Sequence, residues 1–189
     1  MNPRTRRVRR AILDAAGQMF IDHGADQVTA ARVAIEADVA RTTIYRHWPT
    51  SADLLLATID DLATPGFPVV DSGDFEADLR SALNSLCVRL VMRETHKVFS
   101  ALAAQAHSSQ VFADAQSNFI GNLTRPIEQV LQAGKETGIL PSDCDCRRET
   151  DTLASPILYQ HFMLHNEPTA ALVEDVLVPW LAATIPATS

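Results

Sequence analysis

Apolar residues recur every three or four positions through almost the whole chain of 189 residues. This spacing places them on one face of an α-helix, whereas a half-buried strand alternates apolar and polar residues. We find no alternating run of that kind bounded by hairpin turns. The sequence therefore predicts an all-α protein of about nine helices. They are expected near residues 7–23, 30–37, 40–47, 50–62, 74–93, 98–106, 109–137, 149–165 and 169–184.

Cap and turn residues mark the ends of the first three helices. Gly24 is placed to end the first helix in a left-handed conformation, and Thr29 can cap the second. Pro49 stops the third helix, because proline cannot continue the backbone ladder. Three short helical segments within the first 50 residues predict a small N-terminal head.

The rest of the chain predicts a larger helical body. Thr50 and Asp53 have the spacing of a cap for the fourth helix. The stretch TPGFPVVDSG, residues 64–73, is the clearest break, and Pro126 predicts a kink in the longest helix. We therefore expect a boundary near residue 50, with the head over residues 1–50 and the body over residues 51–189.

Charge is distributed unevenly between these two parts. Residues 1–50 hold eight arginines against five acidic residues, a net charge of +3, although the whole chain carries -7. The remainder therefore carries -10. A basic end on an acidic body suits a protein with one surface facing nucleic acid, because phosphate contacts come from local Lys and Arg. The alternative is a solvated basic tail.

The segment TAARVAIEADVARTTIYRHWPTSADLL, residues 29–55, points most directly to a function. It places two short helices on either side of a tight turn at Asp38 and Val39, which is helix-turn-helix geometry. The second helix of such a motif lies in the major groove of DNA, where arginines, hydroxyls and a tyrosine can contact bases and phosphates. The candidate DNA-binding residues are Arg4, Arg6, Arg7, Thr29, Arg41, Thr42, Thr43, Tyr45, Arg46 and His47.

These motifs resemble the tetracycline-repressor (TetR) family of transcriptional regulators. The match consists of R-x-I-L-x-A-A at Arg10–Ala16, F-x-x-x-G at Phe20–Gly24, and V-A-x-x-A-x-V-x-R-x-T-I-Y-R-H-W-P at Val33–Pro49. It covers about the first third of the chain. The resemblance implies a DNA-binding domain over residues 1–50 and a ligand-binding and dimerisation domain over residues 51–189. It also implies a homodimer, a palindromic double-stranded DNA operator, a ligand cavity in the body and release by a small-molecule effector.

Three residues depart from the family's usual pattern. Asp38 replaces the turn glycine, and Ala40 replaces the small polar residue that opens the reading helix. Ser51 stands where the family often has a lysine facing phosphate. We expect these changes to weaken DNA affinity, and the arginine-rich arm Arg4–Arg10 to compensate by reaching the DNA backbone or minor groove.

The last two expected helices form an apolar hairpin joined by Asn166–Pro168. Its apolar face is larger than one surface hairpin should carry, which favours a partner subunit as its cover. Burial against the chain's own body is the alternative. The candidate dimer residues are Leu153, Ile157, His161, Leu164, Leu172, Val176 and Trp180.

Several cysteines and histidines are candidates for metal binding, redox chemistry or the lining of a cavity. Cys144 and Cys146 can be half of a metal or redox site, or two loop thiols, and the spacing of His161 and His165 can hold a metal without an evident third ligand. His96, His107 and Cys87 can line a cavity or simply pack. No catalytic motif is present, so we expect neither an enzyme nor a cofactor.

The sequence also bears on compartment. No apolar run approaches the roughly 18 residues of a membrane span, and the N-terminus does not read as a signal peptide. Together with an odd number of cysteines, this predicts a cytoplasmic protein with no membrane partner. The competing function is a helical protein that binds a small molecule or a partner and lacks specific operator binding.

Overall fold

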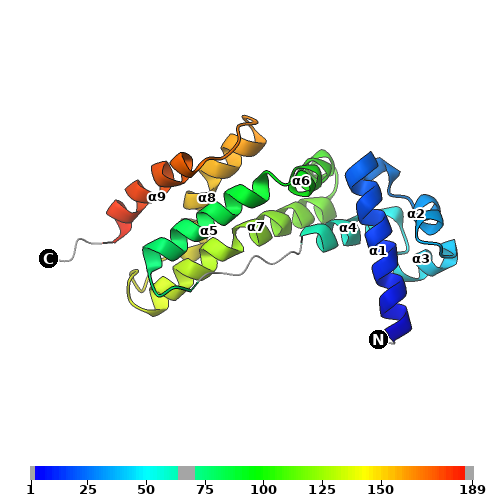
Figure 1. The fold of residues 1–189 in the computed structure, drawn as a ribbon, viewed down its shortest axis with the longest axis horizontal. Coiled ribbons are helices and arrows are strands. Elements are labelled where there is room, and N and C mark those ends of the chain that lie inside the picture. The colour runs from blue at the N-terminus through cyan, green and yellow to red at the C-terminus, as the bar shows by residue number, and fades with distance from the viewer. Residues whose placement is uncertain (1–2, 64–70, 186–189) are drawn as a thin grey trace. The chain divides into compact units, whose positions relative to one another are not determined.

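The computed structural model describes residues 3–63 and 71–185, with side chains for residues 5–62 and 71–185. Within these residues it contains nine α-helices, one short 3-10 helix and no strand, which confirms the all-α prediction (Figure 1). The elements are α1 (Pro3–His23), η1 (Ala25–Gln27), α2 (Ala30–Glu36), α3 (Arg41–His47), α4 (Ser51–Ala63), α5 (Phe75–Leu90), α6 (Arg93–Ala106), α7 (Gln110–Glu136), α8 (Cys146–Phe162) and α9 (Ala170–Thr184).

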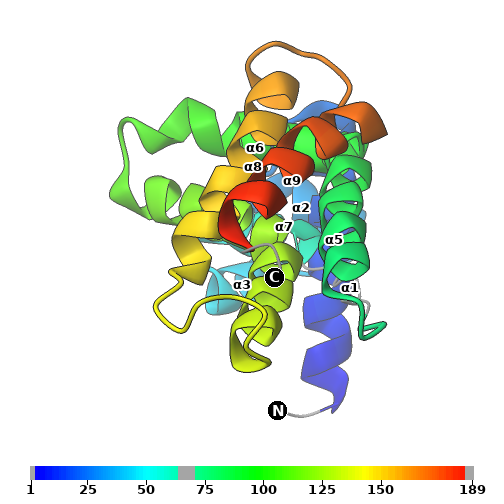
Figure 2. The same cartoon turned by 90° about the vertical axis from the view of Figure 1, so that its left-hand side faces the viewer.

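The helices group into two compact units. The first takes its described residues from 1–65 and 93–119, and the second from 66–92 and 120–189. In the first unit α1 packs against α2, α4 and α6. In the second unit α5, α8 and α9 pack on one another (Figure 2). The units do not divide at residue 50, because α4 packs against α1; the functional division at that residue stays a prediction.

Helix α1 is the central helix of the first unit. Its apolar residues fall on one side, where Ile12, Ala16 and Phe20 are buried. Gly24 ends the helix with a φ of 90°, and its N–H donates to the carbonyl of Phe20 at 2.9 Å, as the sequence predicts. The helix begins at Pro3, earlier than expected, because the fixed φ of proline suits the first turn and its missing N–H is not needed there.

The start of α4 follows the predicted cap. The Asp53 carboxylate accepts from the backbone N–H of Thr50 at 2.9 Å, and Thr50 Oγ1 accepts from the N–H of Asp53 at 3.1 Å. This reciprocal pair satisfies two donors that the helix end would otherwise leave open. It fixes the point at which the chain leaves α3 and turns into α4.

Helix α7 runs through Pro126 without ending. Proline lacks an N–H, so the carbonyl of Asn122 loses its helical partner. The guanidinium of Arg89, which is buried, donates to that carbonyl at 2.9 Å and to the carbonyl of Leu123 at 3.4 Å. Burial lowers the pKa of Arg89. An arginine from α5 therefore satisfies a carbonyl that the proline frees in α7.

Helix α8 has different ends from those predicted. It begins at Cys146 instead of near Glu149, because the Asp145 carboxylate accepts from the N–H of Arg148 at 3.2 Å and caps the first turn. It ends at Phe162, before His165, whose φ of 56° is incompatible with a right-handed helix. The hairpin of α8 and α9 is otherwise as expected.

Candidate nucleic-acid interface

The turn between α2 and α3 is closed by backbone hydrogen bonds. The N–H of Ala37 donates to Val33 at 2.9 Å, and that of Val39 donates to Ala34 at 3.0 Å. Asp38 lies between them with a φ of 49°, in the left-handed region that a glycine would occupy at lower cost. The chain therefore forms the helix-turn-helix geometry that the sequence predicts, with aspartate at its tightest point.

Helix α3 has one buried side and one open side. Ile44 is 0% exposed, and Val33 and Trp48 are also buried, so this side anchors the helix in the first unit. Arg41, Thr42, Tyr45 and Arg46 are exposed, with half of the Tyr45 surface open. Four of the candidate residues thus share one solvent-facing edge of a short, anchored helix.

A groove adjoins the other edge of α3. It has a volume of about 350 Å³ and is lined by residues of α1 and α3 and of the turn, including the half-buried Thr43 and His47. Within the described residues, His47 Nε2 is buried and has no hydrogen-bond partner. The His47 ring lies 5.6 Å from that of Trp48, and the guanidinium of Arg9 lies 5.7 Å from the Trp48 ring.

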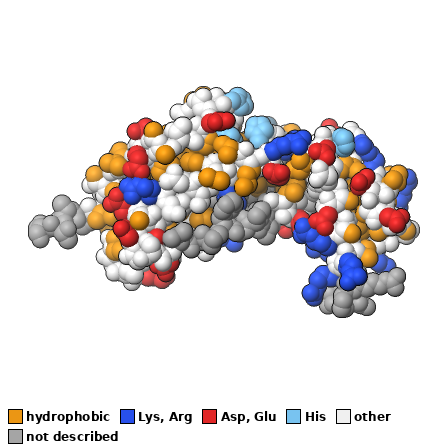
Figure 3. Space-filling model, in the orientation of Figure 1, with side chains coloured by type: hydrophobic (Ala, Val, Ile, Leu, Met, Phe, Trp, Pro, Cys, Tyr) orange, Lys and Arg blue, Asp and Glu red, His pale blue; other side chains and the backbone are white. Residues whose placement is uncertain are grey.

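The arginine arm is part of α1. Arg6 and Arg7 are exposed, whereas the side chain of Arg4 lies outside the described residues. Arg10 forms ion pairs with Asp14 at 2.8 Å and Asp61 at 3.0 Å. Its pKa is raised, first by the hydrogen bond to Asp14 and then by the charge of Asp61. Figure 3 shows Lys and Arg side chains gathered at this end of the first unit.

Thr29 and Ala40 occupy the N-terminal caps of the two motif helices. Thr29 Oγ1 accepts from the N–H of Arg32 at 3.4 Å, so the hydroxyl caps α2 as predicted. Ala40 has extended backbone and makes no side-chain cap bond for α3. The predicted loss of a side-chain cap at Ala40 therefore reduces the stability of α3, the helix that carries the exposed edge.

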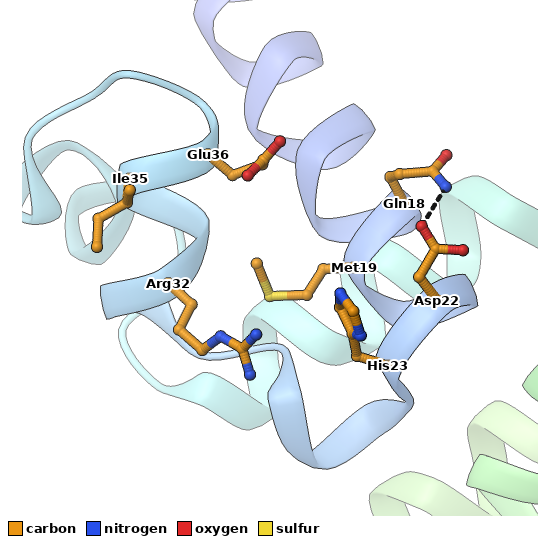
Figure 4. A pocket seen from close by; sticks show the side chains of 7 residues that line it. All are labelled: Gln18, Met19, Asp22, His23, Arg32, Ile35 and Glu36. Atoms are coloured by element: carbon orange, nitrogen blue, oxygen red, sulfur yellow. Dashed lines mark hydrogen bonds between the residues drawn. The ribbon is translucent and has the colours of Figure 1, made fainter.

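A second pocket in this unit lies between the end of α1 and α2, with a volume of about 240 Å³ (Figure 4). None of the candidate DNA-binding residues lines it. Gln18 donates to Asp22 at 2.6 Å, and this bond is the main cause of the lowered pKa of Asp22. Ile35 lines the pocket and is 77% exposed. The candidate residues thus gather on α3 and the start of α1, away from this pocket.

The hairpin of α8 and α9 divides into inner and outer residues. Leu153, Ile157 and Trp180 are buried within the chain, and Trp180 Nε1 donates to Glu149 at 2.6 Å. These three side chains support the hairpin from within. His161, Leu172 and Val176 are half-buried, and Leu164 is exposed. Sequence reasoning omitted three exposed apolar side chains here, those of Tyr159, Met163 and Val178.

The cysteines and the remaining histidines form no metal cluster in the described part of the chain. Burial raises the pKa of Cys87, and burial, followed by Cys146, raises the pKa of Cys144. His161 Nδ1 lies 3.4 Å from the carbonyl oxygen of Asn166. His96 and His107 are exposed.

The two-helix motif is anchored by buried side chains on one side and presents arginine, hydroxyl and tyrosine side chains to solvent on the other. This is the architecture of a helix-turn-helix DNA-binding protein. The family model "Bacterial regulatory proteins, tetR family" matches residues 12–58. The model "Tetracyclin repressor-like, C-terminal domain" matches residues 69–178, more than half of the chain. The chain belongs to the TetR family and is a DNA-binding transcriptional regulator, a class distinct from enzymes.

Individual relatives agree with this assignment. The uncharacterized HTH-type transcriptional regulator YdeS of Bacillus subtilis is 25% identical over 176 residues, which cover 93% of this chain and 89% of YdeS. The fold is similar to that of the TetR family regulator SCO0332, at a TM-score of 0.70 and 24% identity, covering 95% of this chain and 99% of that one. The flavonoid-responsive regulator FrrA has a TM-score of 0.78 at 18% identity, with 96% and 99% covered.

None of the helices in the described ranges is both long enough and apolar enough to cross a bilayer.

Proposed function

We propose that this regulator is a repressor that binds a palindromic operator as a homodimer and is released from it by a small-molecule effector. The observation that carries the proposal is the exposed edge of α3. Arg41, Thr42 and Tyr45 project from a helix whose other side is fixed by the buried Ile44. A rigid helix with a polar edge is what reading of the major groove requires.

The residues divide by role. Arg41 and Thr42, at the N-terminal end of α3, contact base edges, because the start of a reading helix enters the groove most deeply. Tyr45 and Arg46, which are exposed, donate to phosphates, which set the register of the protein on the duplex. Arg6 and Arg7 extend the phosphate contacts from the start of α1 and add affinity that carries no sequence preference.

A homodimer has two reading helices, and one of them binds each half of the palindrome. The half-sites are then about one duplex turn apart, roughly 34 Å. The outer side of the α8–α9 hairpin supports this assembly, because Tyr159, Met163 and Leu164 leave an apolar surface open to solvent. In the proposed dimer these exposed residues contact the partner, and the buried Leu153 and Ile157 hold the hairpin in shape.

Release requires an effector that prefers the conformation unable to bind DNA. Ligand binding shifts the equilibrium only by its difference in affinity for the two conformations. FrrA, whose fold this chain shares, is described as flavonoid-responsive, which supports a responsive body here as well. We assign the effector site to the second unit.

The test begins with DNA selected from a random pool by the purified protein. The double variant Arg41→Ala with Tyr45→Ala should bind the selected duplex at least about 30-fold more weakly in fluorescence anisotropy, because it loses one base and one phosphate contact of ~1–3 kcal/mol each. Unchanged affinity would mean that α3 does not read DNA.

A matched control variant distinguishes the loss of a direct DNA contact from the loss of one positive charge. Arg125 is exposed on α7 and belongs to none of the candidate sites, so Arg125→Ala removes one positive charge without touching α3. We expect its operator affinity to stay within about twofold of the parent at physiological salt, because Arg125 makes none of the proposed DNA contacts and salt screens its charge. A similar loss in both variants would indicate a general charge effect.

A further inference from the structure

The second unit contains a cavity of about 540 Å³ that is lined by the start of α5 and the end of α7. Its volume lies in the range of pockets that hold drug-sized molecules, roughly 300–1,000 Å³. Three elements contribute to its walls: the segment before α5, the first turn of α5, and the last two turns of α7 with the residue that follows Gly138.

The apolar wall depends on one close contact. A Cβ atom at Gly134 would lie 2.4 Å from the Phe75 ring, so the ring lies directly on the backbone of α7. Phe75 is half-buried, and its neighbours in the lining include Val130 and Ile139. The cavity therefore offers an aromatic ring and aliphatic side chains to the body of a ligand.

The polar wall is held in place by hydrogen bonds. Asp78 is buried, and its carboxylate accepts from the Ser72 backbone N–H at 3.0 Å and from Ser72 Oγ at 2.7 Å. Asp74 caps α5 by accepting from the N–H of Ala77 at 3.1 Å. These bonds fix the segment before α5 against the helix, so that Asp71 and Gly73 form a defined rim.

The charges of the lining have one sign. Asp71 and Asp78 are acidic, and the described lining residues include no Lys, Arg or His. The nearest arginine along α5, Arg80, is bound to Glu174 at 2.7 Å and to Glu76 at 2.8 Å. The C-terminal end of α7 adds the negative end of a 27-residue helix dipole. The positive N-terminal end of α5 is offset by Asp74, Glu76 and Asp78 in its cap and first turn.

We propose that this cavity binds an organic cation with a bulky apolar or aromatic body. The positive centre lies beside Asp71 and Asp78, and the apolar body packs on Phe75, where the ring face also attracts the cation. An anion of the same shape would face two carboxylates without a counter-charge and is excluded. The identification of this ligand with the effector rests on the proposed function; the binding site itself does not.

The test uses two probes of nearly the same shape and opposite charge, tetraphenylphosphonium and tetraphenylborate, titrated into the full chain by calorimetry without DNA. Tetraphenylphosphonium should bind at least about tenfold more tightly than tetraphenylborate, because only the cation complements the lining. Equal binding, or tighter binding of the borate, would overturn the proposal.

Variants then locate the bound cation. Asp71 is exposed, so Asp71→Asn should leave thermal unfolding unchanged and weaken tetraphenylphosphonium binding about fivefold, the scale of one partly exposed charge pair. Asp175 is exposed on α9 and does not line the cavity, so Asp175→Asn makes the same charge change and should have no effect. Equal losses in both variants would contradict binding at this site.

A variant that fills the cavity without changing its charge tests whether the cation binds there. Ala133 lines it and is exposed on α7, so Ala133→Trp fills the space without altering charge and should abolish saturable binding. Binding that survives this change would place the cation elsewhere and overturn the assignment.

Adding tetraphenylphosphonium to the operator complex separates the two proposals. If the cation binds as described and DNA stays bound, the cavity is a cation site and its identification with the effector site is wrong. If operator binding is intact and no cation binds, the cavity proposal alone fails.

Discussion

At the scale of single residues, the turn and cap of the reading motif are the places where this chain uses less favourable side chains. Asp38 takes a left-handed conformation that glycine would adopt at lower cost, and Ala40 leaves the first turn of α3 without a side-chain acceptor. Both residues lie within three positions of Arg41. The stability of the reading helix is therefore open to improvement at positions that do not belong to its exposed edge.

Replacing Ala40 by serine should stabilise the chain. Ala40 already has the extended backbone of a cap residue, so a hydroxyl there can accept from an open N–H of α3 and add about 1 kcal/mol to the free energy of unfolding. Urea titration followed by circular dichroism measures the change. Ala104→Ser, at an exposed position inside α6, is the control and should be neutral or slightly destabilising. A loss of stability in Ala40→Ser would show that residue 40 does not cap α3.

The sequence predicts features that depend on neighbouring residues, such as helix caps, better than contacts between residues far apart in the chain. The caps at Thr29 and Thr50 and the end of α1 at Gly24 depend on neighbours within a few residues, and the structure confirms them. Arg10 binds Asp61, 51 residues away, and no local pattern indicates that pair. Which side of the α8–α9 hairpin faces inward is also set by tertiary packing, so exposed Tyr159 and buried Leu153 could not be told apart.

At the scale of helices, the pairing of Arg89 with the proline break in α7 gives a specific coupling. Arg89→Met should cost about 2 kcal/mol, because it leaves the Asn122 carbonyl without its donor. In a Pro126→Ala background, the restored N–H of residue 126 can bond that carbonyl, so Arg89→Met should cost at least about 1 kcal/mol less. An equal loss of stability from Arg89→Met in both backgrounds would show that Arg89 does not replace the backbone donor that is missing at Pro126.

A second helix contact predicts a dependence on pH. The hydrogen bond and charge of Arg80 lower the pKa of Glu174 from its ordinary value of 4.5. The ion pair therefore adds stability at pH values above 4.5 and loses it as the pH falls through the lowered pKa. The stability difference between the parent chain and Glu174→Gln should be present at pH 6 and shrink below pH 4.5. A difference that is constant with pH would contradict the pairing.

Helix number and approximate span were predictable because the apolar period continues through all nine described helices. The expected span of α7, 109–137, differs by one residue at each end from the observed Gln110–Glu136, because the apolar period continues on both sides of Pro126. Proline inside a helix normally signals a break, and α7 continues past Pro126 because an arginine from α5 takes the freed carbonyl. Helix α8 begins at Cys146, before the expected Glu149, because the side chain of Asp145 caps its first turn.

At the scale of the whole molecule, the proposed dimer can be tested through the outer side of the α8–α9 hairpin. Leu164→Glu places a charge on this apolar surface and should convert the dimer to monomer, at a cost of about 2 kcal/mol or more for a charge buried without a partner. Sedimentation velocity measures the assembly, and operator affinity should fall with it. Val88 is an apolar residue on α5 that is 54% exposed, against 46% for Leu164, and Val88→Glu should remain dimeric. A dimer that survives Leu164→Glu would place the interface elsewhere.

The central claim is that the exposed edge of α3 reads bases. Selection of bound DNA from a random pool should be carried out in parallel with the parent protein and with Arg41→Ala. Arg41→Ala should lose preference at one base position in each half-site, symmetrically, and keep the rest of the selected sequence. An identical selected sequence from both proteins would contradict the assignment of Arg41 to base reading.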